Sequence, residues 1–324
     1  MNDGDSSVVS AGVTEEPLIQ VLLAAYNGEP FLAEQLDSVF GQTWNNIQIL
    51  ANDDGSSDDT LNILDRYASR YPGRLDVVRN QCAKGPCGNF TALMQRSTAS
   101  YVAFCDQDDI WKADKLATSM AVMSRVEGTS PKSIPALVYS DMEIMSEDRF
   151  HFDSHWHRAG VHPEVAGFRN LLAQNLVTGC TSIANRALLD LAIPIPVDDV
   201  IMHDYWLALV ACAFGVLQPI REQTVLYRQH SNNVIGAGGV LSWKQRLRRF
   251  RNDPELEKWL TGAATQAAAF LEKYGSRLPE MDRSALISMI HFPQKSSLGR
   301  NLSLLRHGIR RTGLLNHLQF ALRL

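Results

Sequence analysis

The sequence predicts an α/β protein with a doubly wound, mostly parallel sheet, helices on both faces of it, and a helical extension at the C-terminal end. Apolar strand-like runs alternate with amphipathic helical patterns in the first half of the 324-residue chain. These runs are almost continuously apolar, as strands buried on both faces are. The segments between them are long enough for the helical crossovers that parallel strands require.

The first half contains four such runs. We expect strands at 18–26, 47–54, 75–80 and 101–105. The first predicted helix begins near Pro30 and ends at Gly41, because proline favours a first helical turn and glycine a helix end. A capping-box pattern of Ser56 and Asp59 precedes the second helix. A short third helix is expected near 88–98.

The middle of the chain has a different pattern. "ALVYSD" (136–141) predicts another strand, and the aromatic and His-rich segment 150–162 predicts a loop. A helix is expected over 203–215, where apolar residues follow an initial His-Asp pair. The segment 224–239 predicts a strand followed by a Gly-rich loop, and the pattern from 242 onward is helical.

Charge is distributed unevenly. Residues 1–242 hold 16 Lys/Arg and 29 Asp/Glu, whereas residues 243–324 hold 15 and 6, so a net charge of −4 conceals halves of about −13 and +9. We therefore expect a flexible tail over 1–17, the main α/β domain over 18–240, and a basic helical region over 241–324. The absence of a signal-peptide pattern or an apolar run of about 18 residues, together with an odd number of cysteines, favours a cytoplasmic protein.

Polar residues follow three of the predicted strands. In such sheets ligands bind at the carboxyl ends of the strands, which meet at one edge. The residues placed there are Tyr26 and Asn27 after the first strand, Asp53 and Asp54 after the second, and Asp106, Asp108 and Asp109 after the fourth. This convergence predicts a binding site at the carboxyl edge of the sheet.

Asp106 and Asp108, one residue apart, can surround a hard divalent cation such as Mg²⁺ or Mn²⁺, which prefers oxygen ligands and often binds substrate phosphates as well. The alternative role for Asp109 is to cap the following helix. Asp53 and Asp54 fit either a strand-to-helix turn or a nucleotide contact, since a carboxylate accepts hydrogen bonds from a base imide or from ribose hydroxyls.

Five segments together carry a family resemblance. "VLLAAYNGEPFLAEQLDSVFGQT", "DDGSSDDT", "KGPCGNF", "FCDQDDIWKADKL" and "HDYWLALVA…LYRQHSNNVIGA" resemble, in this order, the family 2 glycosyltransferases of the GT-A fold. The likeness is strongest to bacterial rhamnosyltransferases of polysaccharide assembly and covers roughly residues 18–240.

The resemblance implies roles for individual residues. Asp106 and Asp108 would bind a divalent metal that bridges the donor diphosphate, and His230 would approach the metal or the diphosphate. Tyr26, Asn27, Asp53 and Asp54 would hold the base and ribose, and Asn89 would line the nucleotide pocket. Asp204 would be the general base. One departure is that His203 precedes Asp204, where the family usually has an acidic residue.

Three further residues have two interpretations each. Trp111 and Trp206 flank the acidic motifs and would stack on an acceptor sugar beside His203, or else pack in the core. Gly179 would allow close approach of the donor sugar, or else form a simple turn.

The implied chemistry is a single inverting displacement at the anomeric carbon. The metal stabilises the leaving nucleotide diphosphate and one carboxylate takes the proton of the acceptor hydroxyl. We expect a sugar, plausibly rhamnose from dTDP-rhamnose, to be moved to a cell-surface glycan or a lipid-linked acceptor. The alternatives are a UDP-hexose or UDP-N-acetylhexosamine donor, a nucleotidyltransferase, and a non-catalytic nucleotide-binding module.

The C-terminal segment 283–324 has seven Lys/Arg and no acidic residue, with leucines interleaved. A basic amphipathic helix can lie on an anionic membrane surface. The alternatives are a homodimer contact and an ordinary packed subdomain. Nucleic-acid binding is not expected, because no nucleic-acid-binding module is recognisable.

Overall fold

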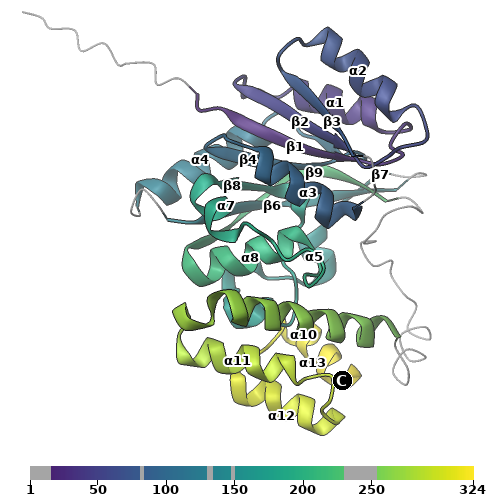
Figure 1. The fold of residues 1–324 in the computed structure, drawn as a ribbon. Coiled ribbons are helices and arrows are strands. Elements are labelled where there is room, and N and C mark those ends of the chain that lie inside the picture. Colours follow the sequence, from purple (N-terminus) through teal and green to yellow (C-terminus); the bar gives the residue numbers. More distant parts are fainter. Residues whose placement is uncertain (1–15, 81–83, 130–133, 147–149, 230–253) are drawn as a thin grey trace, which may run out of the picture.

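The structure is a computed structural model that describes residues 16–80, 84–129, 134–146, 150–229 and 254–324 (Figure 1). A nine-stranded sheet runs through the upper part of the molecule, and a layer of helices lies beyond one of its faces. The tail predicted for residues 1–17 falls largely outside the described residues. Among the described residues, no helix combines the length and the apolar character needed to cross a bilayer.

The first half of the sheet is entirely parallel, as predicted. Its strands are β3 (Leu75–Arg79), β2 (Ile47–Asp53), β1 (Ile19–Ala25) and β4 (Tyr101–Asp106), in that spatial order. Residue Ala24 of β1 pairs with Asn52 of β2 on one side and with Asp106 of β4 on the other. The carboxyl ends of these strands therefore lie at one edge.

The second half of the sheet is mixed. β8 (Ser182–Asn185) inserts antiparallel between β4 and β6 (Ala136–Ser146), and β9 (Val216–Gln229) then pairs parallel with β6. The short strand β5 (Ile110–Trp111) pairs with β9, and β7 (Phe150–Ser154) pairs with β6.

Helices cover both faces because strand side chains alternate between two cores. In β1, Val21 and Leu23 belong to one core and Leu22 to the other. The first core is closed by α1 (Leu32–Phe40), α2 (Thr60–Arg70) and α4 (Lys115–Gly128). The second is closed by α3 (Gly85–Arg96), α7 (Arg186–Ala192) and α8 (His203–Phe214). Between β7 and β8 lie α5 (His155–Ala159), η1 (Pro163–Val165), α6 (Phe168–Leu171) and η2 (Gly179–Thr181).

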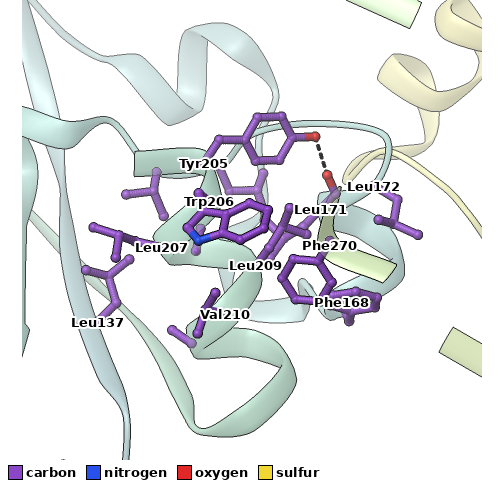
Figure 2. Close-up of a cluster of buried hydrophobic side chains, with 14 of the residues drawn as sticks. Leu137, Phe168, Leu171, Leu172, Tyr205, Trp206, Leu207, Leu209, Val210 and Phe270 are labelled. Atoms are coloured by element: carbon purple, nitrogen blue, oxygen red, sulfur yellow. Dashed lines mark hydrogen bonds between the residues drawn. The ribbon is translucent and has the colours of Figure 1, made fainter. Parts of the chain in front are cut away.

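The C-terminal helices share the second core. They are α10 (Pro254–Tyr274), η3 (Gly275–Arg277), α11 (Glu280–Ile290), α12 (Ser297–His307) and α13 (Leu314–Arg323). In Figure 2 the ring of Trp206 on α8 lies beside that of Phe270 on α10, and the Tyr205 hydroxyl donates a hydrogen bond to the Leu171 carbonyl. The Trp206 and Phe270 ring centroids are 5.3 Å apart. The basic helical region thus packs directly against the α/β part of the chain.

Two local predictions were wrong. The segment 150–162, expected to be a loop, contains β7 and α5, whose N-cap Ser154 accepts a hydrogen bond from the His157 amide. The capping box at Ser56 does not form, because the Ser56 hydroxyl donates to the Asp53 carboxylate. Helix α2 starts instead at Thr60, whose amide donates to Asp58.

Candidate active site

The turn after β4 carries the acidic residues and is held in place by β9. The Asp109 side chain is 1% exposed, and its Oδ1 atom accepts a hydrogen bond from the Arg228 amide at 3.2 Å. The Arg228 guanidinium donates to the backbone carbonyl of Asp108 at 3.1 Å and pairs with Glu34 of α1 at 2.5 Å. β9 therefore holds this turn directly through Arg228, and α1 holds Arg228 through Glu34.

Asp106 and Asp109 come together with Cys180 of η2, each offering one ligand atom within 4.8 Å of the others. Burial raises the pKa of Asp106 well above its usual range, and the neighbouring charges of Asp109, Asp108 and Asp204 raise it further. Burial and the Asp108 charge likewise raise the pKa of Asp109. The carboxyl groups clustered at the carboxyl edge of the sheet therefore oppose one another's ionisation.

A divalent cation fits this cluster. The Asp109 Oδ2 atom is buried and has no hydrogen-bond partner in the described part of the chain, although a buried carboxylate oxygen without a partner is costly. Carboxylate oxygens suit Mg²⁺ and Mn²⁺. Cys180 is a poor ligand for these ions, because thiolates are soft ligands that suit other metals.

The structure changes the set of residues suited to a metal. Asp109 does not cap the helix that follows, because α4 begins at Lys115 and the residue preceding that helix is Asp114. A carboxylate oxygen of Asp109 instead lies within 4.8 Å of one on Asp106. The roles of Asp106 and Asp108 in metal binding stay predictions, and His230 lies outside the described residues.

Asp204 lies in the first turn of α8 and is 8% exposed. Its Oδ2 atom accepts from the Gly179 amide at 2.8 Å, and its Oδ1 atom accepts from the Asn175 side chain at 3.1 Å. Burial raises the pKa of Asp204 to about 6, against the lowering effect of these hydrogen bonds and of one from the Tyr205 amide. At neutral pH the carboxylate is mostly ionised yet more basic than an exposed aspartate.

Close packing explains why position 179 is a glycine, which the sequence alone did not reveal. A Cβ atom at this position would lie 3.1 Å from His203 Nε2 and 3.5 Å from Asp204 Oδ2. The absence of a side chain therefore lets the η2 backbone approach Asp204 closely enough to donate its hydrogen bond. Close approach of a donor sugar at Gly179 remains a prediction.

The three aromatic residues predicted to contact the acceptor lie in the core. Trp206 is 0%, Trp111 3% and His203 3% exposed, so none presents a ring face to a sugar. His203 stacks on Phe90 with ring centroids 4.1 Å apart. Burial lowers the pKa of His203 to about 3, and the ring is therefore neutral at pH 7. The packing alternative is the correct one for both tryptophans.

The predicted nucleotide contacts divide into surface and interior groups. Tyr26 is 53% exposed, and Asn27, also exposed, has a left-handed conformation with φ of 48°. Asn27 exchanges hydrogen bonds with the β2–α2 turn, since its amide donates to Ser56 and its Oδ1 accepts from the Ser57 amide. These two residues form the accessible part of the predicted pocket.

Asp53, Asp54 and Asn89 are buried and act within the protein. The Asp53 carboxylate accepts from the Gly55 amide at 3.1 Å and so forms the turn. The Asp54 carboxylate accepts from the amides of Lys84 and Gly85, which places the start of α3. Asn89 donates to the Asn52 carbonyl and is 2% exposed, and its role in lining the nucleotide pocket stays a prediction.

One residue of the site was missed altogether. Asn175 lies in the irregular segment before η2, and its hydrogen bond to Asp204 links two segments that are 29 positions apart. No local pattern marks Asn175, because its role depends on the tertiary approach of this segment to α8.

Comparisons with known proteins find glycosyltransferases among the similar chains. Residues 20–127 match the family model described as glycosyl transferase family 2. The dTDP-rhamnosyl transferase RfbG of Shigella flexneri is 28% identical over 264 residues, covering 76% of this chain and 83% of that protein. The UDP-Glc:alpha-D-GlcNAc-diphosphoundecaprenol beta-1,3-glucosyltransferase WfgD of Escherichia coli is 29% identical over 199 residues, covering 60% and 70%.

Two solved structures have the same fold. S. aureus TarS 1–349 in complex with UDP aligns with a TM-score of 0.55 and 15% identity, covering 90% of this chain and 92% of that one. The mannosyltransferase PcManGT from Pyrobaculum calidifontis, in complex with GDP-Man and Mn²⁺, aligns with a TM-score of 0.56 and 16% identity, covering 91% and 74%. These likenesses confirm the predicted GT-A type fold.

Proposed function

We propose that this chain, whose residues 20–127 match the family 2 glycosyltransferase model, belongs to that family and transfers rhamnose from dTDP-rhamnose to a hydroxyl group of a growing glycan, which is either a cell-surface polysaccharide or a lipid-linked precursor. A nucleotide sugar is the donor class of the family. The choice of rhamnose is supported by the dTDP-rhamnosyl transferase of Shigella flexneri, which aligns over 76% of this chain.

The observation that carries the mechanism is the environment of Asp204. The acceptor oxygen attacks the anomeric carbon, its proton passes to the Asp204 carboxylate, and the bond between the anomeric carbon and the diphosphate oxygen breaks. A single displacement of this kind inverts the anomeric configuration. The raised pKa of Asp204, about 6, suits a base that works near neutral pH, and the hydrogen bonds from Gly179 and Asn175 orient it.

Asp106, Asp108 and Asp109 would hold a divalent cation at the carboxyl edge of the sheet. When bound, such an ion neutralises the negative charge that develops on the leaving diphosphate. Support comes from the unpartnered Asp109 oxygen and from the mutual repulsion of the carboxylates. The exposed Tyr26 ring and Asn27 would contact the base and ribose of the donor.

A second donor class has its own support. The glucosyltransferase of Escherichia coli named above uses UDP-glucose by its name, so a UDP-hexose or UDP-N-acetylhexosamine is the alternative donor. The family assignment argues against a nucleotidyltransferase and against a non-catalytic nucleotide-binding module.

The test is a donor screen that measures release of the nucleotide diphosphate. dTDP-rhamnose, UDP-glucose and UDP-N-acetylglucosamine would each be incubated with the protein in Mn²⁺, in Mg²⁺ and in excess chelator. We expect turnover of dTDP-rhamnose with metal and none with chelator, and the Asp204→Asn variant controls for contaminating hydrolases. Turnover of a UDP-sugar alone would replace the donor assignment, and turnover in chelator equal to that in Mn²⁺ would refute the metal requirement.

A further inference from the structure

Helices α12 and α13 direct leucines toward solvent. Seven leucines on these two helices are between 49% and 77% exposed: Leu298, Leu302, Leu305, Leu314, Leu315, Leu318 and Leu322. Single exposed leucines are common on soluble proteins, but seven on two short neighbouring helices are not.

The leucines form one stripe on each helix. On α12 they recur at intervals of four and three residues, and on α13 Leu314, Leu318 and Leu322 recur at intervals of four, so each set occupies one side of its helix. The opposite sides pack inward through Leu304, 2% exposed, and Phe320, 1% exposed. An amphipathic helix normally turns its apolar stripe to the core, whereas these helices have a second apolar stripe facing outward.

The two stripes adjoin. α12 and α13 are antiparallel neighbours, because the Asn301 side chain near the start of α12 donates to the Ala321 carbonyl near the end of α13, and Arg300 donates to the Leu324 carbonyl. Asn301 precedes Leu305 by four residues and Ala321 follows Leu318 by three, so both contact residues border the stripes. The seven leucines thus form one surface, which we call the leucine face.

The charges on α12, on α13 and on the segment between them are all positive, and the nearby acid Glu257 of α10 is paired with Arg300. No acidic residue follows Asp282, and Arg306 and Arg310 are exposed beside α12. Other cations of this region are engaged inward: Arg300 pairs with Glu257 at 2.8 Å, and Arg311 lies over the Phe320 ring at 4.2 Å. Two copies of the protein joined through this face would bring arginines of the same sign together, whereas an anionic surface would complement them.

From the outward leucines and their basic border, we propose that the leucine face docks the protein onto an anionic lipid bilayer. The leucines enter the boundary between headgroups and acyl chains, and Arg306 and Arg310 contact the lipid phosphates. Docking of this kind requires no spanning helix. The proposal does not rest on the proposed reaction, because neither the donor nor Asp204 takes part in it.

The test measures sedimentation of the full chain with vesicles of pure phosphatidylcholine and with vesicles that contain about 30% phosphatidylglycerol. We expect binding to the anionic vesicles. The variant Leu298→Ser/Leu302→Ser/Leu305→Ser should lower the partition coefficient at least about tenfold, because three inserted side chains are lost. Arg306→Gln/Arg310→Gln should lower it about fivefold per charge and only on anionic vesicles.

Matched controls lie elsewhere on the surface. Val165→Ser removes a 67% exposed apolar residue from η1, and Arg66→Gln/Arg70→Gln removes two exposed charges from α2, which lies at the far end of the molecule from α12 (Figure 1). Both controls should bind vesicles as the unmodified protein does. Calorimetric binding of dTDP in Mn²⁺ should be equal in every folded variant, which separates this test from that of the reaction.

Three outcomes would overturn the proposal. The unmodified protein would not sediment with either vesicle, or the leucine variant would bind as well as the unmodified protein does. In the third, the leucine substitutions would convert a dimer to a monomer in analytical ultracentrifugation without changing vesicle binding, and the face would then join two copies of the chain.

Discussion

The carboxyl edge of the sheet and the outer side of α12 and α13 both depart from the usual distribution of residues. The sheet edge buries charged residues, whereas the outer helices expose leucines. At the sheet edge, Asp109 and Asp204 are almost fully buried. On the outer helices, leucines such as Leu305 are as exposed as surface lysines usually are. Each arrangement runs against the usual distribution of charged and apolar residues, and each is the basis of one of the two proposals made above.

The two regions differ in how far the protein itself prepares them. Hydrogen bonds from Gly179 and Asn175 hold Asp204, and the Arg228 amide holds Asp109, before any substrate arrives. The leucine face has no comparable network, because a lipid surface requires apolar area and not a fixed geometry. The protein therefore preorganises the candidate active site but not the leucine face.

The largest effect is expected at Asp204. Asp204→Asn keeps the size of the side chain but removes the proton acceptor, so turnover should fall by about 10²–10⁴-fold. Donor binding, measured by calorimetry with dTDP in Mn²⁺, should change less than about twofold. Near-normal turnover would mean that another group is the base.

Removing a charge from the acidic turn after β4 should weaken metal-dependent binding and raise the stability of the metal-free protein. Asp109→Asn should weaken Mn²⁺-dependent dTDP binding by roughly 10–100-fold, as loss of a metal ligand does. In chelator the same variant should melt at a higher temperature than the unmodified protein, because the raised pKa of Asp109 shows that its ionised form destabilises the folded state at neutral pH. Asp108→Asn is the matched comparison, and an unchanged dTDP affinity in Asp109→Asn alone would assign the metal to Asp106 and Asp108.

The pH dependence of kcat/KM should report the pKa of Asp204. The pKa of Asp204 is about 6, so kcat/KM should rise with pH through this value and level off above it, as the base loses its proton. Asn175→Ala removes a hydrogen bond that stabilises the ionised form, so the midpoint should move to higher pH and kcat should fall about tenfold. A lower kcat with an unmoved midpoint would show that Asn175 acts only through packing.

The smallest effect is expected on the leucine face. Leu305→Ser should change the free energy of unfolding by less than about 0.5 kcal/mol, because the side chain is exposed. Phe320→Ala, on the inner side of α13, should cost about 3–5 kcal/mol. Denaturant titration measures both, and a large cost at Leu305 would mean that this leucine packs against the protein.

The parallel part of the sheet was largely predictable because each of its strands is marked by an apolar run in the sequence. The runs at 18–26 and 101–105 are apolar enough to be buried on both faces, and β1 and β4 occupy them. The insertion of β8 between β4 and β6 was not predictable, since four residues contain too little periodicity. β7 and α5 were missed because aromatic and histidine residues fit a loop equally well.

The site was predictable only in part, for a physical reason. Convergence at strand ends follows from the parallel topology, so Asp106, Asp109 and Tyr26 were expected at one edge. Whether a side chain is exposed or buried depends on its tertiary neighbours, and the sequence did not reveal that α10 covers Trp206. Asn175 was missed because its partner lies on a distant helix.

Helix α8 contacts two parts of the molecule at once. Its first turn contains Asp204, and in the same turn Trp206 lies against Phe270 and Tyr274 of α10. A chain that ended before Pro254 would lack the α10 rings that cover Trp206 and would expose the Trp206 ring to water two residues from Asp204. The C-terminal helices are therefore not a detachable module, and grafting them from a relative would succeed only where the aromatic residues facing α8 were transplanted as well.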